Sequence, residues 1–116
     1  MTEREGTLNY LQENNYSFGY ATFWNANVYA GISNGQIEVA GIKNPSTMEP
    51  YRWNTLERYF QHDYCKEKTF ILLDIDEYSE FKDSKVIQAG EGVYQDDRYI
   101  ILEYPNSKMI YDLIGE

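Results

Sequence analysis

The chain is poor in cysteine, histidine and positive charge. Among its 116 residues, Cys65 is the single cysteine and His62 the single histidine. One thiol excludes an internal disulfide and a zinc site made of four cysteines. Ten basic residues stand against 19 acidic ones, which gives a formal net charge of −9. Phosphate backbones are bound through Lys and Arg, so this charge argues against nucleic acid as a partner.

Long apolar runs are also missing from the sequence. No stretch reaches the ~18 apolar residues that a membrane-spanning helix needs, and no secretory signal peptide precedes the first element. A polybasic run that would attach the chain to an anionic membrane surface is absent as well. The chain as given is therefore expected neither to span a membrane nor to carry an address, as would hold for a domain taken from a larger protein.

Aromatic residues are abundant instead. Twelve Tyr, five Phe and two Trp make up 16% of the chain, and 42% of all residues are hydrophobic. A domain of this length can bury a core of its own. We expect residues 1–116 to form a single α/β domain in which amphipathic tyrosines lie both in the core and at the surface.

The rest of the chain is arranged around residues 16–42. Large and small side chains alternate over 16–22, which predicts a strand. Trp24, Val28 and Ile32 then follow at helical spacing, and Asn34-Gly35 is a typical helix end. Alternation returns over 36–42. These residues predict a right-handed strand–helix–strand unit with parallel strands.

The remaining elements complete an α/β fold. The patterns predict a short helix over 7–15, a loop over 43–51, a helix over 54–61, a central strand over 68–75, a short helix over 76–82 and a strand over 85–89. Residues 92–95 and 98–104 predict an antiparallel hairpin, followed by a last helix capped by Asn106. The composite is a three-layer α/β domain with a sheet of four or five strands, parallel in its N-terminal part, and with helices on both faces.

Three short patterns could carry chemistry, and each has a structural interpretation. Asp74 and Asp76 form a D-x-D at a strand end, a place where hard oxygen ligands can hold a metal, but we expect Asp76 to cap the next helix. His62 has Asp63 beside it, but no serine or cysteine lies in a nucleophile motif, so a surface histidine is expected. Gly90-Glu91-Gly92 precedes a strand and lacks the third glycine of a phosphate loop. No catalytic residue, metal or cofactor is predicted.

The candidate ligand-binding site lies where the first strand passes into its helix. Trp24, Asn25 and Asn27 stand at the edge on which open α/β sheets place ligands, and Tyr20 and Trp53 could join them. Aromatic rings that pack on a sugar face, together with amides that bond its hydroxyls, would suit a glycan. The alternative is that Trp24 belongs to the core and Asn25 caps the helix.

Several of these motifs together carry a family resemblance. The sequence resembles the soluble C-terminal domains that follow the transmembrane helices of bacterial GT-C-type glycosyltransferases. The matching features are GYATFWNA at 19–26, SNG at 33–35, Trp53, the apolar strand at 70–73, and YIILEY at 99–104 with Asn106. They occur in the same order over most of the chain, and none of them is a catalytic signature.

The resemblance implies a position on the extracytoplasmic side of the bacterial cell membrane, as part of a larger membrane protein. The catalytic acidic residues of such enzymes lie in loops between membrane helices, which this chain does not contain. The domain alone would then be inactive, and its partners would be a glycan or the parent's transmembrane region. Two alternatives stay open: a free-standing glycan- or ligand-binding module, and a small cytoplasmic α/β enzyme.

Overall fold

The computed structural model describes residues 3–22, 37–50 and 57–114. In these ranges the chain forms helices α1 (Glu3–Glu13), α3 (Ile75–Phe81), α4 (Lys85–Ala89) and α5 (Ser107–Ile114), with a 3₁₀ turn at Glu57–Phe60. The strands are β1 (Phe18–Thr22), β2 (Glu38–Asn44), β3 (Glu49–Pro50), β4 (Thr69–Asp74), β5 (Glu91–Gln95) and β6 (Tyr99–Tyr104).

All six strands belong to one mixed sheet in the order β3-β2-β1-β4-β6-β5. β1 pairs in parallel with β2 on one side and with β4 on the other. The three remaining pairings, β2 with β3, β4 with β6 and β5 with β6, are antiparallel. The predicted parallel start and antiparallel C-terminal hairpin are therefore confirmed.

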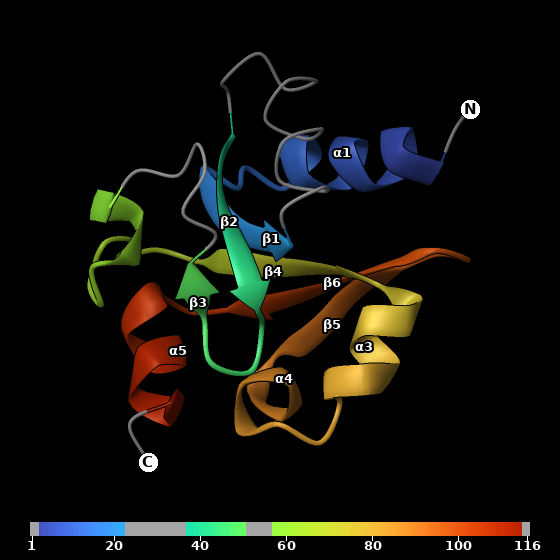
Figure 1. The fold of residues 1–116 in the computed structure, drawn as a ribbon. Helices are drawn as coiled ribbons and strands as arrows, with labels where there is room; N and C mark the ends of the chain where they lie inside the picture. The colour runs from blue at the N-terminus through green and yellow to red at the C-terminus, as the bar shows by residue number, and fades with distance from the viewer. Residues whose placement is uncertain (1–2, 23–36, 51–56, 115–116) are drawn as a thin grey trace.

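Helices cover both faces of the sheet, as predicted for three layers (Figure 1). α1 lies over one face, and α3, α4 and α5 lie under the other. Alternate residues of each strand lie on opposite faces of the sheet, because successive side chains of a strand point in opposite directions. In β1, Phe18 and Tyr20 face the side of α4 and α5, whereas Ala21 faces α1.

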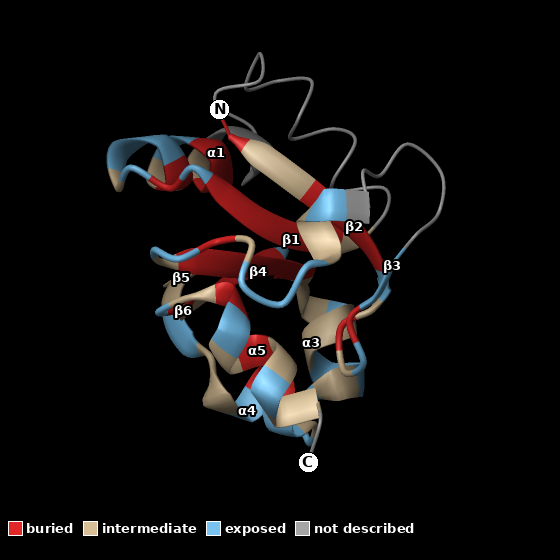
Figure 2. Ribbon diagram, turned by 90° about the vertical axis from the view of Figure 1, so that its left-hand side faces the viewer, coloured by how far each residue is buried: buried red, intermediate tan, exposed pale blue. Residues whose placement is uncertain are grey.

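Each face of the sheet has its own hydrophobic core. The core under α1 is made of residues from that helix and from β1, β4 and β6: Leu8, Leu11, Ala21, Phe70, Leu72 and Ile101, among others. The opposite core joins β1, β4 and β6 to α4 and α5 through Tyr20, Ile71, Leu73, Val86, Ile87, Leu102 and Ile110. The strands between them are buried on both sides, as Figure 2 shows for β1 and β4. Such two-sided burial explains why 70–73 is an uninterrupted apolar run.

Three predictions about local structure were wrong. Residues 85–89 form helix α4 and not a strand, because the Ser84 side chain accepts a hydrogen bond from the Ile87 N–H and starts a helical turn there. The sheet has six strands and not four or five, since Glu49–Pro50, within the predicted loop, pairs with β2 at the edge. Finally, Asp74 caps α3, whereas the prediction assigned this role to Asp76.

The predicted crossover helix after Thr22 falls on residues 23–36, which lie outside the described residues. Residues 51–56, directly before the 3₁₀ turn, lie outside them as well. Of the expected helix at 54–61, residues 54–56 lie outside the described ranges, and Glu57–Phe60 form the 3₁₀ turn. The parallel pairing of β1 with β2 holds regardless, because it rests on the strands themselves.

Candidate functional site

Of the five predicted ligand-binding residues, Tyr20 is the one that the structure describes. Its side chain is fully buried, and its ring packs edge-on against Phe18 with the ring centroids 5.0 Å apart. Its hydroxyl lies 3.0 Å from Ser107 Oγ, and burial raises the pKa of Tyr20 to about 12. Tyr20 is thus part of the core on the α5 side in this structure. Trp24, Asn25, Asn27 and Trp53 lie outside the described residues, so their role stays a prediction.

The acidic residues at the carboxyl end of β4 form the hydrogen bonds that cap helix α3. Asp74 Oδ1 accepts a hydrogen bond of 2.7 Å from the Glu77 N–H, and Glu77 Oε1 accepts one of 3.1 Å from the Asp74 N–H. The hydroxyl of Thr22, the last residue of β1, also donates a hydrogen bond to Glu77 Oε1. This reciprocal capping accounts for Asp74 of the D-x-D pattern. Within the described ranges no three metal-ligating side chains come together.

A hollow of about 580 Å³ opens at the opposite end of the parallel strands, where they begin. β1, β2 and β4 run parallel, and the hollow lies where all three begin. Its lining comes from the start of β1, the start of β2 and the loop before β4: Ser17, Phe18, Glu38, Tyr64, Cys65, Lys66 and Glu67. The site is therefore assembled from three separate segments of the chain.

Two carboxylates on the rim of this hollow are held by neutral hydroxyl groups. The Tyr64 hydroxyl donates to Glu38 Oε2 at 2.8 Å, and the Ser17 hydroxyl donates to Glu67 Oε1 at 2.6 Å. A carboxylate has about four acceptor positions, so one such bond orients it and leaves capacity for further donors. Both glutamates can consequently accept hydrogen bonds from a ligand that enters the hollow.

Aromatic rings form the wall next to Glu38. Phe18, Tyr59 and Tyr64 pack against one another, with ring centroids 4.9 to 5.3 Å apart. Phe18 is almost fully buried, whereas Tyr59 and Tyr64 are partly exposed. Burial and the neighbouring Glu38 raise the pKa of Tyr64, which keeps its hydroxyl protonated as a donor at neutral pH. The tyrosine ring thus offers apolar surface beside a fixed carboxylate.

His62 is a surface residue, as predicted, and Cys65 is a buried thiol. Cys65 is buried, its thiol points to the carbonyl of Glu67 at 3.3 Å, and burial raises the pKa of the thiol. A raised thiol pKa disfavours the reactive thiolate. His62 is exposed, and its ring is stacked on Tyr111 with centroids 4.5 Å apart.

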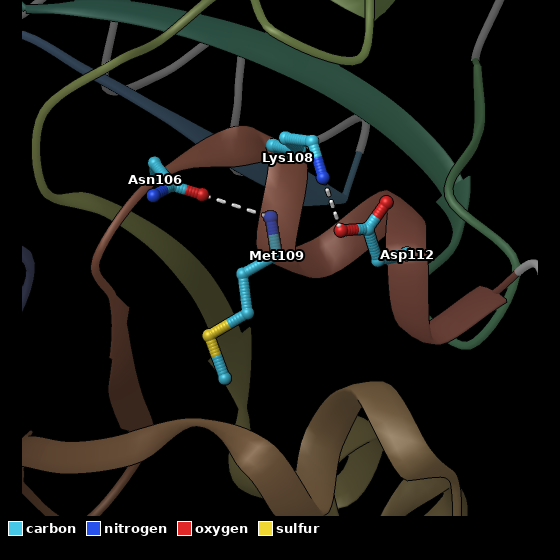
Figure 3. Close-up of polar contacts among 4 residues, drawn as sticks. All are labelled: Asn106, Lys108, Met109 and Asp112. Carbon is cyan, nitrogen blue, oxygen red and sulfur yellow. Dashed lines mark hydrogen bonds and ion pairs between the residues drawn. The ribbon is translucent and has the colours of Figure 1, made fainter.

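A second, smaller hollow of about 300 Å³ lies along α5. Its lining residues are Asn106, Lys108, Met109, Asp112 and Leu113. Figure 3 shows that their polar groups bond to one another. Asn106 Oδ1 accepts from the Met109 N–H at 2.8 Å, and Lys108 Nζ contacts Asp112 Oδ2 at 2.7 Å. These contacts cap and support the helix, as predicted for Asn106.

The larger hollow was not predicted from the sequence. Ser17 and Glu67 are 50 positions apart, and only the pairing of β1 with β4 brings them together. The available signal was modest: a Tyr-Cys-Lys-Glu segment at 64–67, polar apart from its ring and thiol, directly before the most apolar strand. Loops before strands carry such residues in many folds, so the pattern alone does not indicate a site.

The comparisons with known proteins identify no relative. No family model matches the chain, and neither a curated protein sequence nor a solved structure is similar to it. Among the helices of the described residues, none is long and apolar enough to cross a membrane.

Proposed function

We propose that this chain is a non-catalytic domain of a glycosyltransferase-like bacterial membrane protein, and that it contacts glycan on the extracytoplasmic side. The proposal joins the sequence resemblance to the chemistry of the larger hollow. The observation that carries it is the combination of a partly exposed tyrosine ring with two oriented carboxylates around one opening.

This combination suits a sugar for two reasons. A sugar ring has an apolar face that can pack on Tyr64, as aromatic side chains offer large apolar area at low entropic cost. Its hydroxyls are donors that Glu38 and Glu67 can accept, and a site built to bond hydroxyls rejects ligands that lack them. The hollow is also large enough for one or two sugar rings, since ligand sites commonly measure roughly 300–1,000 Å³.

Titration of the chain with neutral oligosaccharides tests the glycan contact. Tetramers of glucose, mannose and N-acetylglucosamine are added to isotopically labelled protein, and amide shifts are followed by NMR. We expect at least one tetramer to shift the amides of Ser17, Phe18 and residues 64–67. If none of the three shifts these amides at millimolar concentration, the glycan contact is refuted.

Two substitutions of Tyr64 distinguish the contribution of its ring to binding from that of its hydroxyl. Tyr64→Ala is expected to abolish the shifts, whereas Tyr64→Phe keeps the ring and is expected to weaken binding only severalfold. Tyr10→Ala is the matched control, because Tyr10, on α1, is also partly exposed but packs on Tyr16 and Tyr94. Equal losses in the two alanine variants would contradict a role for the hollow.

The membrane context is tested on the gene. An open reading frame that encodes several apolar segments of about 20 residues before this domain would support the proposed parent protein. A frame without them would favour the free-standing binding module, which uses the same hollow.

A further inference from the structure

The charged residues around the larger hollow indicate which class of ligand it would bind. Among the lining residues that the structure describes, Glu38 and Glu67 carry negative charge and Lys66 is the one cation. Lys66 is exposed, as is Arg58, which lies outside the lining and interacts with Tyr64 and, through its charge, with Glu38. The lining is therefore net negative, on a chain of net charge −9.

The groups that orient the two carboxylates do not neutralise them. Among the described residues, the hydrogen bonds to Glu38 come from the hydroxyls of Tyr64 and Tyr59, and the one to Glu67 comes from the hydroxyl of Ser17. Glu38 also raises the pKa of Tyr59, after the larger effect of burial, so that neighbour too is a neutral phenol at pH 7. Both carboxylates are thus oriented by neutral donors. A fixed carboxylate is a stronger partner for a cation than for a neutral hydroxyl.

We propose that this hollow selects glycans that bear free amino groups, with the ammonium held by Glu38 and Glu67 and the sugar ring against Tyr64. This inference rests on the proposed function and specifies its ligand class. The same charges discriminate against uronic acids and phosphorylated sugars, because like charges in a site are repulsive. Aromatic surface next to the carboxylates adds to the attraction for a cation.

The test compares oligosaccharides that differ in charge and share a backbone length. Glucosamine tetramer, N-acetylglucosamine tetramer and galacturonic acid tetramer are titrated into the full chain at about pH 6, where an amine of ordinary basicity is protonated. We expect the amine to bind about three- to tenfold more tightly than its acetylated counterpart at low salt, a range that fits two solvent-accessible ion pairs. This preference should vanish at about 1 M salt, where the screening length is only about 3 Å. The uronate should not bind.

Three glutamine substitutions locate the effect. Glu38→Gln and Glu67→Gln should each weaken binding of the amine more than binding of the acetylated tetramer, so that the preference for the amine falls, because glutamine can still accept from a sugar hydroxyl but carries no charge. Glu49→Gln is the matched control, since Glu49 is exposed on β3 and does not line the hollow. An equal reduction in all three variants would mean general attraction to an acidic protein and would overturn the proposal.

The outcomes also separate this inference from the proposed function. Equal binding of amine and acetylated tetramers at the hollow would leave the glycan contact in place and refute the preference for amines. Absence of binding by both tetramers, together with the neutral ones above, would refute both.

Discussion

Gly19 shows how one residue fixes the geometry of the sheet at its centre. It lies in β1 opposite Phe70 of β4, and a Cβ atom at this position would overlap the Phe70 ring. That ring is fully buried, and Tyr16 packs edge-on against it at 5.6 Å, so it has little room to move. Gly19 is one of the small residues that alternate with large ones over 16–22, and the Phe70 ring fills the space that a larger side chain would need.

Gly19→Ala is expected to destabilise the protein by about 1–3 kcal/mol, the usual cost of an extra methyl group in a packed core. Gly92→Ala is the matched control, because no atom lies within 4 Å of the Cβ it would introduce, and it should stay within about 0.5 kcal/mol. Urea unfolding of both variants measures the difference. Equal stability of the two variants would mean that the Phe70 ring can yield.

The candidate site could be only partly predicted at the residue scale. The sequence predicted a site of aromatic and amide side chains around the end of β1, and Tyr20, the one described residue of that site, lies within β1 and is buried. Glu38, Tyr64 and Glu67 carry no signature of their own. Their relation to one another depends on strand pairing over long sequence separations, which single-residue patterns do not contain.

Helix α3 illustrates the element scale, because its start depends on one partly buried carboxylate. Glu77 closes the capping box with Asp74 and also accepts from Thr22. Burial raises the pKa of Glu77 above its usual value of 4.5, although hydrogen bonds from Asp74 and Thr22 act against this shift. The folded state therefore favours the neutral acid more than the unfolded state does.

This shift predicts how stability depends on pH. The contribution of Glu77 is fully present below its unfolded pKa and is lost as the pH rises through the raised folded value. Glu77→Gln removes the titration and can still close the capping box, since glutamine also serves at this position. The variant should therefore gain stability relative to wild type as the pH rises through the unfolded and then the raised folded pKa of Glu77.

Thermal unfolding at several pH values measures this gain. Glu80→Gln removes a charge from the exposed side of the same helix and controls for the change in net charge. If Glu77→Gln loses stability relative to wild type as the pH rises, the assigned direction is wrong.

Elements with a clear period or a long apolar run were predictable, and short ones were not. Strands β1, β2, β4 and β6 and helix α5 agree with their patterns, since burial of one or both faces imposes a period on the sequence. Lys85–Ala89 has only five residues, and its adjacent Val86 and Ile87 suit a strand or a helix equally well. There the cap at Ser84 decided the outcome. β3 has two residues, which is too short for any period to show.

For the whole molecule, the sequence patterns predicted the α/β class and the three layers but not the order of the strands in the sheet. The parallel unit at the start and the hairpin at the end each follow from local patterns. That β4 pairs with β1 on the side away from β2 follows from packing between distant segments. This pairing creates the larger hollow, so site and strand order escaped prediction for the same reason.

The strand order also has a consequence for the path of folding. Residues 69–104 supply β4, β5 and β6 together with α3 and α4, so this half of the sheet forms from one continuous segment. β1 has to close a loop of some 50 residues to reach β4. Contacts between neighbours in sequence form earlier because they lose less chain entropy. The C-terminal half is therefore expected to build the nucleus onto which β1 and β2 dock late.

Two isoleucines that are both fully buried separate these stages kinetically. Ile101→Val in β6 and Ile42→Val in β2 should each cost about 0.5–1.5 kcal/mol at equilibrium. The first should mainly slow refolding, and the second should mainly accelerate unfolding. Stopped-flow measurements with the opposite assignment would place the nucleus in the parallel half, and the region around the larger hollow would then be the first part of the protein to form rather than the last.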